Sequence, residues 1–215
     1  MPPIGIFGGT FDPIHFGHLR LAEEMAAALG LSRVLFMPAG QPPHREVPLI
    51  SAAHRLEMVR LAIAGNSFFA VDAREVQREQ PSYTVESLSS LRDELGPDQP
   101  MWLLLGADAF LGLASWHQWQ RLFGLANIAV VTRPGAQSLQ PDDMQEPLKS
   151  EVLNRQMADH TAAGPAGSVW FQHMTPLGIS ATAIRETLSR QGSVRYLLPD
   201  TVLNYIYEHQ LYLQT

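Results

Sequence analysis

The stretch GIFGGTFDPIHFGH, from Gly5 to His18, decides how this chain folds. The apolar run at its start, residues 4–8, is typical of a buried strand, and an amphipathic stretch over residues 16–30 follows it. A strand, a glycine turn and a helix in this order open the βαβ units of parallel sheets. Glycines at such a turn let the backbone approach a ligand closely, and the first turn of the helix presents N–H donors to anions. The stretch therefore predicts a parallel sheet and, at the end of its first strand, a binding site.

The size and composition of the chain limit the number of domains and the class of protein. With 215 residues, 46% of them hydrophobic, the chain can bury one core, and we expect a single domain, 1–215. Cysteine is absent, which excludes disulfides, thiolate metal ligands and cysteine nucleophiles and is compatible with a reducing cytoplasm. Residues 1–8 lack the features of a secretion signal, and the most apolar run, 101–116, is too short to span a bilayer. We therefore expect a cytoplasmic protein without a membrane partner, and the sequence leaves a homo-oligomer open.

The charged residues restrict the class of ligand. A net charge of −6 argues against a broad nucleic-acid-binding face, so no nucleic-acid partner is expected. The chain has fourteen arginines but one lysine, Lys149, and no glycines precede that lysine in PLKSEV. A lysine-bearing phosphate loop is thereby excluded. Phosphates would have to be bound by backbone amides, arginine and histidine.

Beyond the first motif, short apolar runs alternate with longer amphipathic stretches, which is the pattern of a parallel sheet with crossover helices. Strands are predicted at residues 4–8, 33–39, 68–72, 101–106, 127–133 and 168–172. Helices are predicted at residues 16–30, 51–65, 84–95, 107–112, 117–123, 180–190 and 199–210, the first of them ending at Gly30. The predicted fold class is α/β, a single Rossmann-like domain with a central, mainly parallel sheet flanked by helices on both faces. In such folds ligands bind at the carboxyl ends of the strands, near the point where the strand order reverses.

Three segments depart from this alternation. Residues 38–50 contain too much proline for a helix and are predicted to form a loop over the carboxyl edge of the sheet. Residues 134–165 are polar, and we expect a peripheral, irregular insertion with one helix near 145–158. A C-terminal helical part is expected near 180–215.

The first motif carries side chains as well as a glycine turn. Gly8 and Gly9 allow a tight turn, and His15 and His18, three positions apart at a helix start, lie on one side of its first turn. With Thr10 they form a cluster of hydrogen-bond donors. For the glycines alone an ordinary strand-to-helix turn is the favoured explanation, and the histidines shift the balance toward a ligand; a His-x-x-His pair could instead bind a metal whose further ligands come from elsewhere.

A second motif, GISATAIRE at residues 178–186, lies near the other end of the chain. Ser180 is a candidate N-cap, Thr182 falls in the first helical turn and Arg185 lies one turn along. By itself this is a well-capped helix. A positive helix N-terminus with these side chains also suits the oxygens of a polyphosphate.

Polar residues also follow other predicted strands and loops. Gly106 and Asp108 come directly after the strand at 101–106, where a carboxylate can accept hydrogen bonds from a ribose, and Arg133 ends another strand. His44 and Arg45 lie on the proline-rich loop. Thr84 and Trp116 could meet an aromatic ligand, although Trp116 could equally pack between helices.

Together these motifs resemble one family, the bacterial nicotinate mononucleotide adenylyltransferases of NAD synthesis, whose wider class is marked by a His-x-Gly-His motif. Here that motif reads HFGH, His15 to His18. The resemblance extends over nearly the whole chain, through GIFGGTFDPIHFGHL, MPAGQPPHR, PSYTVESL, LLLGADAF, SWHQW, VVTRPG and ISATAIRE, in the family's order. It implies transfer of AMP from ATP to nicotinate mononucleotide, giving deamido-NAD and pyrophosphate, with Mg²⁺ on the polyphosphate and no metal site built by the protein.

The resemblance also implies roles for individual residues. The catalytic set would be His18, His15, Thr10 and Arg185. ATP would be bound by Gly8, Gly9, Thr10, His15, His18, Gly106, Asp108, Ile179, Ser180, Thr182 and Arg185, and nicotinate mononucleotide by His44, Arg45, Thr84, Trp116 and Arg133. The family often has a second serine in the last motif, where this chain has Ala181.

Three other functions are weighed against this one. The first is a sister adenylyltransferase acting on nicotinamide mononucleotide or phosphopantetheine. The motifs PSYT and SWHQW argue against phosphopantetheine as the substrate. The second is a non-catalytic nucleotide sensor on the same fold. The third, an NAD-dependent dehydrogenase, is disfavoured because the first turn reads GGTFDPIH rather than G-x-G-x-x-G.

Overall fold

The structure is a computed structural model that describes residues 1–41, 48–132, 143–175 and 177–213. Its centre is a six-stranded sheet whose strands pair in parallel in the order β3-β2-β1-β4-β5-β6. The strands are β1 (Ile4–Gly9), β2 (Arg33–Pro38), β3 (Phe69–Val71), β4 (Met101–Gly106), β5 (Asn127–Thr132) and β6 (Val169–His173). All six strands were predicted within two residues. The strand order reverses between β1 and β4, which places the expected ligand crevice beside the glycine turn.

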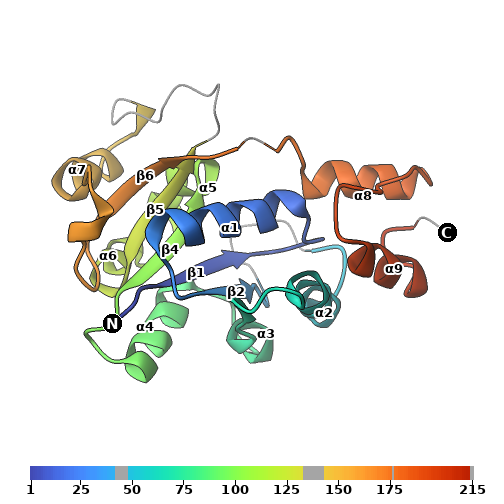
Figure 1. The fold of residues 1–215 in the computed structure, drawn as a ribbon, viewed down its shortest axis with the longest axis horizontal. Coiled ribbons are helices and arrows are strands. Elements are labelled where there is room, and N and C mark those ends of the chain that lie inside the picture. The colour runs from blue at the N-terminus through green and yellow to red at the C-terminus, as the bar shows by residue number, and fades with distance from the viewer. Residues whose placement is uncertain (42–47, 133–142, 176, 214–215) are drawn as a thin grey trace.

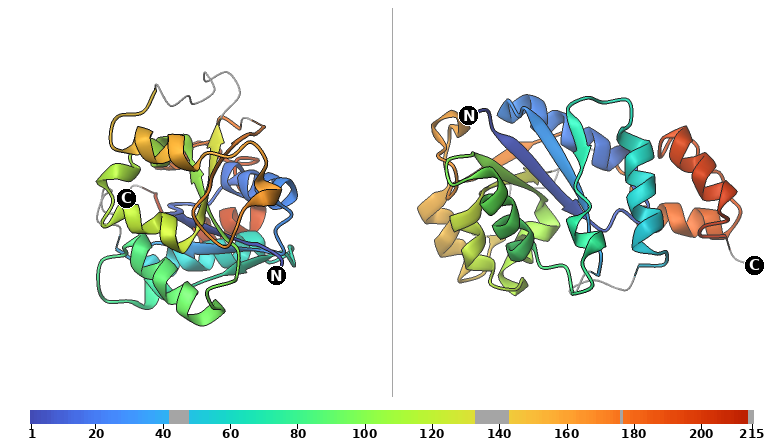
Figure 2. Two further views of the ribbon diagram at one scale, coloured as in Figure 1. Left: turned by 90° about the vertical axis from the view of Figure 1, so that its left-hand side faces the viewer. Right: turned by 90° about the horizontal axis from the view of Figure 1, so that it is seen from below.

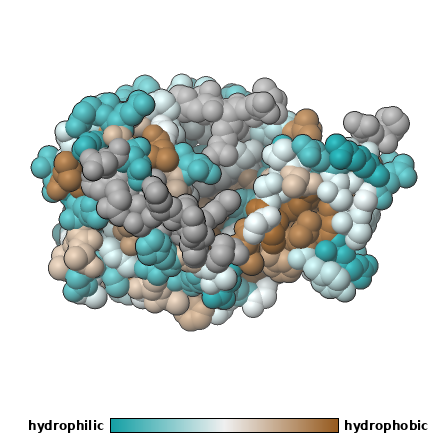
Figure 3. All heavy atoms as spheres, turned by 90° about the horizontal axis from the view of Figure 1, so that it is seen from above, coloured by the Kyte–Doolittle hydropathy of each residue, from teal (hydrophilic) through white to brown (hydrophobic). Residues whose placement is uncertain are grey.

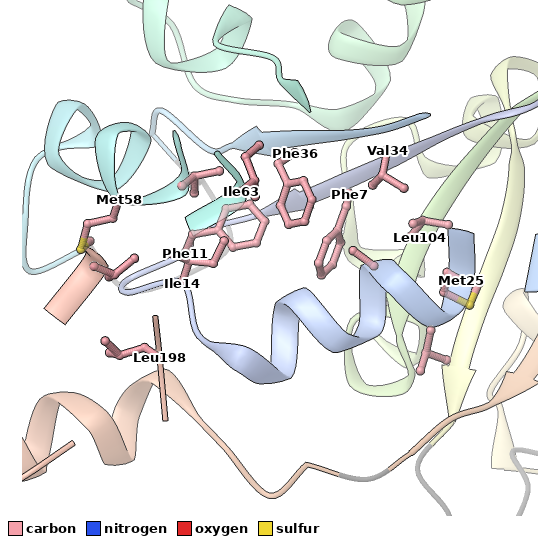
Figure 4. Packing of buried hydrophobic residues seen from close by; sticks show 14 of the residues in the cluster. Phe7, Phe11, Ile14, Met25, Val34, Phe36, Met58, Ile63, Leu104 and Leu198 are labelled. Atoms are coloured by element: carbon pink, nitrogen blue, oxygen red, sulfur yellow. The ribbon is translucent and has the colours of Figure 1, made fainter. Parts of the chain in front are cut away.

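Helices cover both faces of the sheet (Figure 1). One face is packed by α1 (Phe16–Leu29) and α2 (Ala52–Ile63), and the other by α4 (Thr84–Leu95), α5 (Ala107–Leu111), α6 (Leu122–Leu125) and α7 (Leu148–Arg155). Successive strand residues point to opposite faces, so Phe7 joins the core cluster of the first face, shown in Figure 4, and Ile6 joins that of the second. The predicted α/β fold with helices on both faces is confirmed.

The C-terminal helices α8 (Ala181–Ser189) and α9 (Asp200–Glu208) lie together at the end of the molecule toward which β1 runs (Figures 1 and 2). Ile184 of α8 and Val202 of α9 are buried in the same cluster as Ile14, which follows the glycine turn. The end of the chain is thus fixed against its beginning by hydrophobic packing.

Local backbone geometry explains the differences from the predicted helices. The first helix ends as predicted, because Gly30 adopts a left-handed conformation with φ 59°. The continuous helix predicted at 117–123 is wrong. Gln118 is left-handed, with φ 49°, and the chain forms the short turns η1 (Leu113–Ser115) and η2 (Trp119–Arg121) before α6. The short helix α3 (Arg74–Gln77) was not predicted.

The described part of the segment predicted as an insertion, residues 143–165, contains α7. Leu148 and Val152, four positions apart on that helix, are both buried in the second core cluster. Within the described ranges, no helix combines the length and hydropathy that crossing a bilayer requires.

Candidate functional site

Two neighbouring cavities lie at the carboxyl ends of the strands, where the sheet order reverses. The first has a volume of about 890 Å³ and the second of about 280 Å³. The residues that line both are Gly8, Gly9, Thr10, Asp108 and Ala109. The two cavities therefore share a wall made of the β1 turn and the start of α5.

The first cavity brings together the two motifs from opposite ends of the chain. Every residue predicted to bind ATP lines it: Gly8, Gly9, Thr10, His15, His18, Gly106, Asp108, Ile179, Ser180, Thr182 and Arg185. In the space-filling view of Figure 3, hydrophobic surface gathers between the body of the molecule and the C-terminal helices. Hydrophobic residues are also part of the cavity wall, among them Leu21 and Ile179.

The glycines at the end of β1 do not make the turn: Gly8 leaves space open to the cavities, and Gly9 leaves room for the ring of Phe11. β1 continues through Gly9, and the left-handed residue of the turn is Phe11, with φ 50°. A Cβ atom at Gly8 would meet nothing within 4 Å, so it would stand in the open cavities that Gly8 lines. A Cβ at Gly9 would lie 2.9 Å from the ring of Phe11. The tight turn predicted at the glycines thus occurs two residues later.

The two histidines and Thr10 form one group beside this turn. The rings of His15 and His18 stack, with centroids 3.7 Å apart, and the His15 backbone N–H donates to Nδ1 of His18 at 3.3 Å. When Nδ1 accepts a hydrogen bond, the proton of a neutral imidazole lies on Nε2, which makes Nε2 a donor. Oγ1 of Thr10 is buried and has no hydrogen-bond partner among the described residues. These donors suit an anionic ligand.

The start of α8 has the geometry that its sequence predicts. Ser180 is the N-cap, and its Oγ accepts a hydrogen bond from the Ala183 N–H at 3.2 Å. Arg185 donates through Nη1 to the backbone carbonyl of Asp12 at 2.8 Å and through Nη2 to Oγ1 of Thr182 at 3.4 Å. The first of these bonds fixes the Arg185 guanidinium against the chain segment that follows β1.

The second cavity contains two of the residues predicted to bind a mononucleotide, Thr84 and Trp116. Tyr83 and His117 line it as well, with ring centroids 4.5 Å apart. The wall therefore offers aromatic surface and a hydroxyl, which suits a planar, polar ring. The remaining predicted residues of this group, His44, Arg45 and Arg133, lie outside the described residues.

Comparison with known proteins assigns this site to a family. Residues 6–187 match the cytidylyltransferase-like family. A protein of Dechloromonas aromatica named "Probable nicotinate-nucleotide adenylyltransferase" is 56% identical over 98% of this chain and 97% of its own length. A protein of Pseudomonas aeruginosa with the same name is 48% identical over 97% of this chain and 96% of its own.

The chain belongs to the nicotinate-nucleotide adenylyltransferase family. The resemblance carried by its sequence motifs is thereby confirmed.

Solved structures agree on the fold. The nicotinic acid mononucleotide adenylyltransferase of Plasmodium falciparum, solved in complex with NaAD, superposes with a TM-score of 0.73 at 16% identity, over 99% of this chain and 98% of that one. The same enzyme in complex with APC gives a TM-score of 0.72 over the same shares. At this identity the likeness shows a common fold.

Arg55 holds two segments beside the cavities, and this role was not predicted from the sequence. Its side chain is only 1% exposed, and it donates through Nη1 to the carbonyl of Thr10 at 2.6 Å and through Nη2 to the carbonyl of Gly40 at 3.0 Å. Burial lowers the pKa of Arg55, and the negative charge of Asp12 partly opposes that shift. One signal could have identified it, because helical spacing places Arg55 on the same face of α2 as Met58 and Val59.

A buried carboxyl group beside the second cavity was also missed. Glu75 accepts a hydrogen bond from Oγ of Ser87 at 2.7 Å, and burial raises its pKa, while the hydroxyls of Ser87 and Ser82 lower it in part. Oγ of Ser82 accepts hydrogen bonds from the backbone N–H groups of Gly40 and Gln41 at 3.0 and 3.2 Å. This network holds the chain that follows β2, and it is packed so closely that a Cβ at Gly40 would lie 2.1 Å from the Glu75 carbonyl oxygen.

Proposed function

We propose that this chain transfers the AMP group of ATP to nicotinate mononucleotide, forming nicotinate adenine dinucleotide (deamido-NAD) and pyrophosphate. One observation carries the proposal: the cavity lined by both phosphate-binding motifs adjoins the cavity that contains Thr84 and Trp116 across the β1 turn. Two substrates bound in these cavities would meet at the turn. The α-phosphorus of ATP and the phosphate of the mononucleotide would then lie near Gly8, Gly9 and Thr10.

The first cavity would bind ATP. His18, Ser180 and Arg185 would donate to the triphosphate, and the helix N-terminus of α8 adds partial positive charge. Gly106 and Asp108 line the same cavity beyond β4, where the Asp108 carboxylate would accept from a ribose hydroxyl.

The second cavity would bind the nicotinate ring. Trp116 would stack on the ring, and the hydroxyl and backbone N–H of Thr84 would donate to the nicotinate carboxylate. A carboxylate only accepts hydrogen bonds, whereas an amide brings its own donor, so this arrangement favours the acid over nicotinamide mononucleotide. His44, Arg45 and Arg133 are proposed on their sequence motifs to contact the mononucleotide.

The reaction depends on alignment of the attacking phosphate oxygen with the α-phosphorus of ATP and does not need a general base. The attacking oxygen belongs to a phosphate that is anionic at neutral pH; it forms a new bond to the α-phosphorus, and the bond from that phosphorus to the bridging oxygen of pyrophosphate breaks. Pyrophosphate leaves with the electron pair of that bond. The side chains supply orientation and hydrogen bonds to the oxygens whose negative charge increases, with Nε2 of His18 as the main donor.

Mg²⁺ would enter with ATP and screen the charge of its polyphosphate. The described residues contain no group of three His, Asp or Glu side chains that could hold a metal ion. The donors of the first cavity instead suit the phosphate oxygens that such an ion leaves uncovered. Because cysteine is absent, the chain suits the reducing cytoplasm, where we expect the reaction to take place.

A substrate panel tests this function. The full chain is incubated with ATP, Mg²⁺ and one acceptor at a time, and pyrophosphate release and the dinucleotide product are both measured. We expect the highest kcat/KM with nicotinate mononucleotide, a lower one with nicotinamide mononucleotide and no reaction with phosphopantetheine. ATP binding without pyrophosphate release from any acceptor would instead identify a nucleotide sensor and overturn the proposal.

A further inference from the structure

The phenol group of Tyr212, at residue 212 of 215, contacts Asp12, which lines the first cavity. Tyr212 donates through its hydroxyl to Oδ1 of Asp12 at 2.6 Å, across 200 positions of sequence. Its backbone is left-handed, with φ 62°, which a residue other than glycine adopts only where its surroundings hold it. Burial, followed by the hydrogen bond to Asp12, raises the pKa of Tyr212 far above its usual range, so the phenol is a neutral donor.

Asp12 is a buried carboxylate whose two oxygens both accept hydrogen bonds from neutral groups. The residue is 6% exposed; Tyr212 donates to Oδ1, and the backbone N–H of Leu49 donates to Oδ2 at 3.1 Å. Asp12 and Leu49 both line the first cavity. The carboxylate is thus held by a phenol and an amide, neither of which cancels its charge.

Two arginines lie close to this carboxylate, yet each donates to a backbone carbonyl. Arg55 donates to the carbonyl of Thr10, and Arg185 to the carbonyl of Asp12 itself. Both lie near enough to Tyr212 for their charges to affect its pKa. Among the described residues, neither arginine forms an ion pair with a carboxylate of Asp12.

The arrangement prevents a pairing that electrostatics favours. A carboxylate and a guanidinium that lie close together attract each other and tend to form a bidentate pair. Such a pair would neutralise Arg185, which lines the cavity and is placed to meet an anion. Neutral donors on both oxygens of Asp12 keep the carboxylate in another orientation.

We propose that Tyr212 is a positioning residue for ATP: its hydroxyl holds the Asp12 carboxylate away from the Arg185 guanidinium, which is thereby left to bind the triphosphate. This inference rests on the proposed function, because it takes ATP as the ligand of the first cavity. Under this proposal the Tyr212 hydroxyl contributes to triphosphate binding, whereas a residue that served only hydrophobic packing would not need a hydroxyl.

The test is a double-mutant cycle on Tyr212→Phe and Asp12→Asn. Tyr212→Phe removes one oxygen and keeps the ring, and Tyr205→Phe is the matched control, because the Tyr205 hydroxyl bonds to Nδ1 of His54 at 2.9 Å and does not line the cavity. Four quantities are measured for each full-length variant: Tm, the Kd for inorganic tripolyphosphate, the KM for ATP and the KM for nicotinate mononucleotide.

We expect Tyr212→Phe to raise the Kd for tripolyphosphate and the KM for ATP on the order of tenfold, since a hydrogen bond to a charged group is lost and a cation is neutralised. The KM for nicotinate mononucleotide should change by less than about twofold, because Arg185 does not line the second cavity. Asp12→Asn removes the competing charge, so adding Tyr212→Phe to it should change the Kd by less than about twofold.

Two results would overturn the inference. The first is an equal effect of Tyr212→Phe with and without Asp12→Asn, or on both substrates, which would indicate that the phenol only stabilises the fold. The second is unchanged tripolyphosphate binding in Tyr212→Phe. An active wild-type chain with either result would leave the proposed function intact, whereas a wild-type chain that transfers no AMP would contradict that function itself.

Discussion

Replacing Arg55 with methionine should lower the stability of the protein by removing hydrogen bonds that hold the walls of the two cavities, without removing a residue that is proposed to contact a substrate. Arg55 is almost fully buried and joins two segments that wall the cavities, through the carbonyls of Thr10 and Gly40. Methionine fills most of the space of the arginine stem and donates no hydrogen bond. The substitution therefore leaves two part-buried carbonyls without their donor.

The size of the effect follows from those two carbonyls. A fully buried acceptor that loses its partner costs about 1–3 kcal/mol, so about 2–6 kcal/mol is the upper bound for these two part-buried carbonyls. Part of this is offset because the variant no longer buries a guanidinium, the same desolvation that lowers the pKa of Arg55. We expect a net loss of about 2–4 kcal/mol in the free energy of unfolding, which for a chain of this size lowers Tm by about 4–16 °C.

Urea unfolding followed by circular dichroism measures this loss, and steady-state pyrophosphate release measures activity on the folded fraction. The matched control is Arg60→Met on the same helix, since Arg60 is exposed and pairs with Glu57 at 3.4 Å. That control should change stability by less than about 0.5 kcal/mol. If Arg55→Met were as stable as the control, Arg55 would not hold the two segments together, and the argument from its hydrogen bonds would be refuted.

Three further predictions address the chemistry and the packing of the site. His18→Ala should lower kcat by about 10²–10³-fold, as loss of a preorganised donor does, and near-normal turnover at saturating substrates would remove His18 from the mechanism. Gly8→Ala should leave Tm unchanged, because its Cβ would meet no atom within 4 Å, but should raise the KM of at least one substrate; unaltered kinetics would show that the turn does not approach the substrates. Glu75 has a raised pKa in the folded state, so its folded form binds more protons than the unfolded chain, and the wild-type protein should lose stability as pH rises from about 4.3 through that raised pKa. Glu75→Gln should lack this loss, and parallel curves of stability against pH for the two proteins would contradict the assignment.

The sheet, and the meeting of the residues that follow β1 and β4, were readable from the sequence for a physical reason, whereas the meeting of the first motif with ISATAIRE was expected from the family resemblance. Parallel strands joined by crossover helices bring their carboxyl ends to one edge, so residues that follow β1 and β4 must be neighbours there. The capping pattern at Ser180 is equally local, because the N-cap bond spans three residues. Both predictions depended on periodicity or on short motifs.

The contacts that hold the site together were not readable in this way. The bond from Tyr212 to Asp12 joins the two ends of the chain, and nothing in either local sequence specifies its partner. Arg55 looks like an ordinary polar residue of a helix until its neighbours on α2 are assigned to the core. Phe11 takes the left-handed position that a glycine would be expected to fill, because its ring packs against those of Phe7 and Phe36.

The account depends on one triphosphate bridging the two ends of the chain, and a crystal structure with a non-hydrolysable ATP analogue and nicotinate mononucleotide measures this directly. We expect triphosphate oxygens within hydrogen-bonding distance both of the His15–His18 motif and of Ser180 or Arg185, with the nicotinate ring against Trp116. A triphosphate held at only one of these ends, or a mononucleotide outside the second cavity, would contradict the account.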